Sequence, residues 1–196
     1  MKSTKINVKI RFLEKFLGTA PDPEIYQKYI ASLAPEGTDT RDEVETLSAI
    51  EEKGTTRFHR DENGLFIYNY MIIGFLKEAG NTLKEQLGTK AVKNKVEQFV
   101  FCSPRKISLN KSVPDGVFER PKRVNSPMGP VSTLGRSEYI KSETEIKFML
   151  ELLDNKDIKP DDLLEILDYG KFKGLGQWRN GGYGAFEVID FDIVTK

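Results

Sequence analysis

Two kinds of hydrophobic periodicity alternate along this chain, and their order predicts an α+β fold. Apolar and polar residues alternate at 6–12 and again at 146–152, which is typical of strands with one buried face. At 68–87 and at 160–169 the apolar residues recur instead at spacings of three and four, as they do on the buried face of a helix. These four segments predict two strands and two helices.

Two further strands complete the predicted order. An apolar run at 96–109, interrupted by Pro104, indicates a short strand or hairpin, and 186–193 forms a closing strand. In the closing strand, Ile189 disturbs the alternation and predicts a bulge. The resulting order is strand, helix, strand, strand, helix, strand. It predicts a ferredoxin-like βαββαβ unit, an antiparallel sheet with both helices on one face.

Two long segments lie outside this pattern. The polar stretch 16–64 predicts a helical insertion with helices at 23–33 and 40–52. The segment 110–140 contains four prolines and three glycines, shows little periodicity, and is expected to be an extended loop. Because 196 residues with 38% apolar content suffice for one core, we predict a single domain over 1–196 with two insertions.

Composition restricts the chemistry. The 30 basic and 30 acidic residues balance, so any nucleic-acid binding must come from a local patch. One cysteine, Cys102, excludes an internal disulfide and a cysteine zinc cluster, and one histidine, His59, excludes a multi-histidine metal site. We expect no cofactor. Cys102 lies in an apolar strand and is expected to be an inert thiol. The absence of a signal sequence and of a membrane-length apolar run predicts a cytoplasmic protein.

A glycine-rich segment, 174–184, separates the last predicted helix from the closing strand. Five glycines there surround Trp178 and Arg179. A dinucleotide or phosphate-binding loop is excluded, because its glycines would follow a strand and open a helix. Two interpretations stay open. The segment is either a flexible hairpin or bulge, or a loop whose main-chain amides and side chains contact nucleic acid.

The side chains around these glycines suit single-stranded nucleic acid. Cations can bind phosphates, aromatic rings can stack on bases, and amide side chains can form hydrogen bonds. The candidates are Lys171, Lys173 and Arg179 for phosphates, Trp178 and Tyr183 for bases, Gln177 and Asn180 for hydrogen bonds, and Gly174, Gly176, Gly182 and Gly184 for main-chain contacts. Five basic residues nearer the middle of the chain could line a strand-binding groove, or could simply be solvated: Arg105, Lys106, Arg120, Lys122 and Arg123.

Two motifs resemble those of the RAMP superfamily, the repeat-associated proteins of CRISPR systems. Gly74 and Lys77, in the segment 70–77, match a family helix motif. The loop GLGQWRNGGYGAFEV matches the family's C-terminal glycine loop at the positions Gly174, Gly176, Gly182, Gly184 and Phe186. The resemblance implies a RAMP-like fold and contact between this loop and guide RNA. The helical insertion at 16–64 matches no member that we can name, so a phage or mobile-element relative is a further interpretation.

Three functions follow as hypotheses. The first is a non-catalytic protein that binds single-stranded nucleic acid, RNA rather than DNA. The second is a metal-independent endoribonuclease, a RAMP-like activity for which His59 is the one candidate general acid or base. The third is an interaction protein that self-assembles, or a phage-encoded inhibitor that docks on a host CRISPR or other defence complex through the helical insertion. None of the three involves a membrane.

Overall fold

The computed structural model describes residues 2–21, 55–126 and 129–194. The two helices expected at 23–33 and 40–52 lie outside these residues. Within them, the chain combines antiparallel sheets with a small number of helices, which confirms the α+β class. None of the helices in the described ranges is long and apolar enough to cross a membrane.

The centre of the molecule is a four-stranded sheet in the order β11-β1-β10-β6, in which all neighbouring strands are antiparallel. The strands are β1 (Ser3–Phe12), β6 (Val100–Ser103), β10 (Glu145–Leu153) and β11 (Phe186–Val194). Alternate residues of the central strands are buried, as the sequence predicted. On β1, Ile6 and Ile10 are fully buried. The bulge is also confirmed, because Lys9 faces Asp190 and the next residue faces Val188, which leaves Ile189 unpaired.

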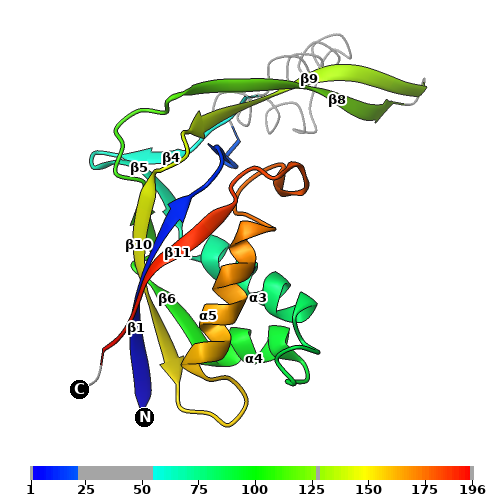
Figure 1. Ribbon diagram of the computed structural model, residues 1–196. Coiled ribbons are helices and arrows are strands. Elements are labelled where there is room, and N and C mark those ends of the chain that lie inside the picture. Colours follow the sequence, from blue (N-terminus) through cyan, green and yellow to red (C-terminus); the bar gives the residue numbers. More distant parts are fainter. Residues whose placement is uncertain (1, 22–54, 127–128, 195–196) are drawn as a thin grey trace, which may run out of the picture.

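Three helices cover one face of this sheet (Figure 1): α3 (Tyr70–Thr82), α4 (Val92–Phe99) and α5 (Pro160–Asp168). The apolar stripes of α3 and α5 enter the same core as the sheet. Helix α5 begins where the sequence indicates, with Pro160 in the first turn and the Asp162 carboxylate accepting a hydrogen bond from the Lys159 amide at 2.7 Å.

The predicted boundaries around α3 and α4 need correction. The strand β5 (Gly64–Tyr68) precedes α3, so the helix starts at Tyr70, and it ends at Thr82 before a series of turns. Residues 96–99 belong to helix α4, because Val92 and Val96 form a buried helical pair. Strand periodicity begins only at Val100, so the apolar run that predicted a strand contains the end of a helix and the start of a strand.

Short strands frame the beginning and end of the stretch 16–64. Strand β2 (Phe16–Leu17) pairs with β9 (Gly129–Ile140), and β3 (Thr55–Thr56) runs parallel to β9. A separate three-stranded sheet, which we call the small sheet, consists of β4 (His59–Asp61), β5 and β7 (Lys106–Ser108). The described ends of the predicted helical insertion are therefore strands.

The extended loop expected at 110–140 is instead a long β-hairpin of β8 (Gly116–Ser126) and β9. It extends beyond the end of the four-stranded sheet (Figure 1). Apolar and polar residues show little alternation in the sequences of β8 and β9. The reason is that these strands pair with each other and much of the hairpin does not cover the core. Pro121 is tolerated because, among the described strands, β8 pairs only with β9 and is an edge.

We expect Cys102 to be unreactive in the native protein. Its side chain on β6 is 8% exposed, and burial raises the pKa of the thiol to about 12. Since the thiolate is the reactive form, thiol titration at neutral pH should detect no fast-reacting group until denaturant is added, and one group afterwards. Rapid labelling of the native protein would contradict this burial.

Candidate nucleic-acid interface

The glycines of the segment 170–185, which we call the glycine loop, allow its backbone to pack closely on itself and on the core. A Cβ on Gly174 would lie 2.0 Å from the carbonyl carbon of Gly184. A Cβ on Gly176, where φ is +82°, would lie 2.6 Å from the Leu17 carbonyl oxygen and from the Phe16 ring. Larger residues at these positions would separate the loop from the strands that support it.

Part of the loop backbone is committed to these internal contacts. Seven of its main-chain N–H groups donate to protein carbonyl oxygens, those of Phe172, Lys173, Leu175, Gly181, Gly182, Gly184 and Ala185. The Gly184 amide, for example, donates to the Lys15 carbonyl at 2.8 Å. Because these seven amides already have acceptors, they are not free to hold phosphates. Side chains must therefore supply most of any ligand contact.

Aromatic side chains join the glycine loop to the hairpin. The Trp178 ring centroid lies 5.8 Å from that of Phe118 and 6.2 Å from that of Tyr183, and the Arg120 guanidinium lies 4.0 Å above the Trp178 ring. A Cβ on Gly135 of β9 would meet the indole at 2.8 Å. One face of Trp178 is thus occupied by Arg120, so the ring anchors the hairpin as well as bordering the surface.

Two loop cations share one carboxylate on α3. Glu78 accepts from Lys173 Nζ at 2.5 Å and from Arg179 Nη1 at 2.7 Å. These two bonds, first that of Lys173, lower the pKa of the Glu78 carboxyl against the opposing effect of partial burial. All three side chains are between 30% and 39% exposed, so water and ligand can reach them.

These groups border one pocket, which we call the loop–hairpin pocket. Its volume is about 470 Å³. It is lined by Glu78, Arg120, Lys173, Gly176, Trp178, Arg179, Asn180 and Gly181. Six of these eight were predicted from the sequence as nucleic-acid-binding residues, and they come from two segments that are far apart in the chain. The sequence missed Glu78 and Gly181. Glu78 is one acid among many on helix surfaces, and no local pattern links it to the loop.

Other predicted residues near the glycine loop lie outside the pocket. Lys171 pairs with Asp168 at 3.4 Å, and Gln177 accepts a hydrogen bond from Thr56 Oγ1 at 3.2 Å. The Tyr183 ring packs on Phe118 at 5.1 Å. Gly174, Gly182 and Gly184 shape the loop backbone. Arg123 is exposed on β8 towards the hairpin end, and the side chain of its neighbour Lys122 lies outside the described part of the structure.

The remaining candidates lie on the small sheet and its connection to β6. Lys106 pairs with Asp61 at 2.6 Å, and Arg105 is exposed just before β7. His59 lies among aromatic rings, with its centroid 4.8 Å from that of Tyr68, and burial lowers the pKa of its imidazole. The structure does not bring His59 into the loop–hairpin pocket.

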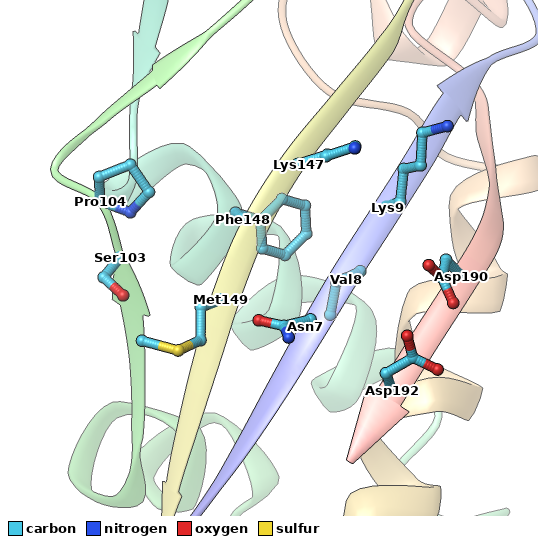
Figure 2. A pocket seen from close by; sticks show the side chains of 10 residues that line it. All are labelled: Asn7, Val8, Lys9, Ser103, Pro104, Lys147, Phe148, Met149, Asp190 and Asp192. Carbon is cyan, nitrogen blue, oxygen red and sulfur yellow. The ribbon is translucent and has the colours of Figure 1, made fainter. Parts of the chain in front are cut away.

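A further pocket of about 570 Å³ lies on the face of the four-stranded sheet that carries no helix (Figure 2). Lys9 and Lys147 extend from neighbouring strands, and Asp190 and Asp192 extend from the edge strand β11. Lys9 is also paired with Glu145 at 2.5 Å. With two ammonium groups and two carboxylates in its lining, this pocket offers no net positive field to an anion. None of the predicted site residues borders it.

The fold of this chain is similar to those of chains in solved structures. No family model and no curated protein sequence matches the chain. Among 141 similar chains of solved structures is one from the cryo-EM structure of the type III-B Cmr-β bound to cognate target RNA. That chain and this one share 12% identity with a TM-score of 0.55, over 99% of this chain and 61% of the other. The chain thus spans about three fifths of the length of its neighbour, and the likeness establishes a shared fold.

Proposed function

We propose that this protein is a RAMP-like, single-stranded RNA-binding protein. The α+β class and the element order β1–α3–β6–β10–α5–β11 support a ferredoxin-like arrangement, which is part of this proposal. Its structural neighbour is bound to target RNA, which favours RNA over DNA as the ligand. Since a fold alone does not define a function, the proposal depends on the loop–hairpin pocket.

The observation that carries the proposal is the convergence of cations in this pocket. Arg120 comes from the hairpin, and Lys173 and Arg179 come from the glycine loop, whereas Glu78 is the one acidic residue of the lining. Three positive groups against one negative group leave a local excess of two positive charges on a chain whose total charge is zero. Such a local excess is what phosphate binding requires when there is no overall positive field.

The other lining groups suit the rest of a nucleotide. Asn180 is exposed and offers both hydrogen-bond donors and an acceptor. Trp178 is half-buried, with Arg120 across one face, so its accessible part can contact a base or ribose. Farther along β8, exposed Arg123 extends the positive surface along the hairpin. RNA would therefore follow the junction between glycine loop and hairpin.

We expect Arg179→Ala to weaken binding to single-stranded RNA by about five- to ten-fold at low salt. Removing one phosphate contact should also reduce the slope of log K against log salt by about 0.7. Filter binding or fluorescence anisotropy across a salt series would measure both quantities. Lys95→Ala is a matched control, because Lys95 lies on α4, outside the pocket, and pairs with Asp157. If the wild-type protein fails to bind RNA at low salt, the proposal is wrong.

We also propose that the protein works within a larger assembly, because its neighbour belongs to the type III-B Cmr-β structure. Exposed apolar side chains on the hairpin, Val117 and Leu134, are 50% and 47% exposed and are available for protein contact. Light scattering with and without RNA would show whether the chain self-assembles. A strictly monomeric protein in both conditions would leave a different partner as the occupant of this surface.

A further inference from the structure

We propose that the outer face of the small sheet is a second RNA subsite, where an unpaired base stacks on Tyr70 and Arg105 binds the neighbouring phosphate. This inference rests on the proposed RNA-binding function. It assigns a distinct surface, built from β4, β5, β7 and the start of α3, that shares no residue with the lining of the loop–hairpin pocket.

The outer face of the small sheet is unusually aromatic. On its inner face, Leu65 and Ile67 of β5 are buried in the main core. Because side chains alternate along a strand, Phe66 and Tyr68 point to the other face, and His59 lies directly opposite Phe66 on β4. An antiparallel sheet with one packed face normally presents polar side chains on the other. Packing of the main core does not account for three rings on the outer face, so another role for them is expected.

The rings form a continuous group that ends in an exposed one. The His59 and Tyr68 centroids are 4.8 Å apart, and Tyr68 lies edge-on to Phe66 at 5.3 Å. Tyr70 then stacks on Tyr68 at 5.5 Å with an interplanar angle of 18°. Phe66 is 6% exposed, so the group covers it, but Tyr70 is 62% exposed. The open side of the Tyr70 ring therefore extends the stack towards solvent, where a base can join it.

A cation lies beside this stack. The Arg105 carbonyl accepts a hydrogen bond from the Asn69 amide at 2.9 Å, which fixes its backbone next to the segment that carries Tyr68 and Tyr70. Arg105 is exposed and makes no ion pair within the described residues. Lys106, in contrast, is paired with Asp61 at 2.6 Å and lies 4.7 Å above the Phe66 ring. Lys106 thus neutralises Asp61, and Arg105 stays available for a phosphate.

The chemistry of the surface selects its ligand. A planar base can lie flat on Tyr70, and its phosphate can reach an arginine on an adjacent turn. An apolar peptide would gain little from Arg105, and an isolated phosphate would gain little from the rings. A nucleotide unit of a single strand satisfies both groups, whereas a base held in a duplex cannot stack there.

The test compares ligands with and without bases. For Tyr70→Ala we expect about ten-fold weaker binding of single-stranded oligouridylate but unchanged binding of an abasic ribose–phosphate oligomer of the same length. Tyr70→Phe keeps the ring and should bind like the wild type. Arg105→Ala should weaken both ligands and lower the salt slope by about 0.7. Phe101→Ala removes another half-exposed ring, on β6, and serves as the control.

The outcomes separate this inference from the proposed function. Binding of oligouridylate that is unaffected by Tyr70→Ala but weakened by Arg179→Ala would overturn the second subsite and leave the loop–hairpin pocket intact. An equal loss for base-containing and abasic ligands would also overturn it, because stacking would then make no contribution. If the wild-type protein binds neither ligand at low salt, both proposals fail together.

Discussion

Replacing Gly184 with alanine is expected to destabilise the protein by about 3 to 5 kcal/mol, which is at the upper end of single-residue effects. The backbone at Gly184 has a φ of +71°, and an added Cβ would lie 1.9 Å from the Leu175 carbonyl oxygen. The Gly184 amide and carbonyl also make hydrogen bonds of 2.8 Å to Lys15 and 2.9 Å to Leu175. Relief of the clash would move this backbone and break both bonds.

Gly182 provides the matched control for this prediction. Its φ is +86°, so alanine there has the same left-handed strain, but no heavy atom lies within 4 Å of the added Cβ. We expect Gly182→Ala to cost only about 1 to 2 kcal/mol, the conformational part of the penalty. Urea denaturation of both variants would give the difference in the free energy of unfolding. Equal losses would show that strain alone, and not close packing of the loop, makes Gly184 necessary.

Local hydrophobic patterns were enough to predict the elements that bury one regular face in the core. The strand beginning at Ser3 and the helix beginning at Pro160 were predicted because each buries one regular face against a single core. The bulge at Ile189 was predicted for the same reason, because an extra residue shifts the alternation of apolar and polar residues by one position. Local patterns therefore predicted two of the three helices that cover the four-stranded sheet, α3 and α5, but not α4.

The hairpin β8–β9 could not be predicted in this way. Its strands pair with each other away from the main sheet, so burial imposes no alternation on much of its sequence, and its prolines suggested a loop. The candidate site depends on this hairpin, because Arg120 reaches Trp178 only when β8 and the glycine loop are folded together. Local composition indicated which residue types are suited to contact RNA. Only tertiary pairing showed which of them meet.

Glu78 is the clearest case of a residue that only the structure reveals, and its removal should strengthen RNA binding. We expect Glu78→Gln to raise affinity for single-stranded RNA by up to about 50-fold at low salt. The variant frees both Lys173 and Arg179 from their carboxylate, so neither cation has to leave an ion pair before it binds a phosphate. Because both cations contact phosphates in the wild-type complex as well, the slope of log K against log salt should stay close to the wild-type value.

The physical basis is competition between a fixed carboxylate and a mobile phosphate for the same two cations. In the wild-type protein, RNA must displace Glu78 before Lys173 and Arg179 can bind it. Loss of these partly exposed ion pairs should change stability by only about 0 to 1 kcal/mol, so the effect on binding can be measured in a folded protein. Glu97→Gln is the matched control, because it removes the same charge from a pair with Lys77 at 3.2 Å, outside the pocket.

The pH dependence gives a second test of this competition. The pKa of Glu78 is held below the ordinary 4.5 by Lys173 and Arg179, so the carboxylate stays charged from about pH 6 to 8. The affinity ratio of Glu78→Gln to wild type should therefore be constant over that range, and should shrink only in acid, where protonation of Glu78 releases the cations in the wild-type protein as well. Weaker binding by Glu78→Gln would reverse the assignment, because the carboxylate would then be orienting the two cations towards RNA.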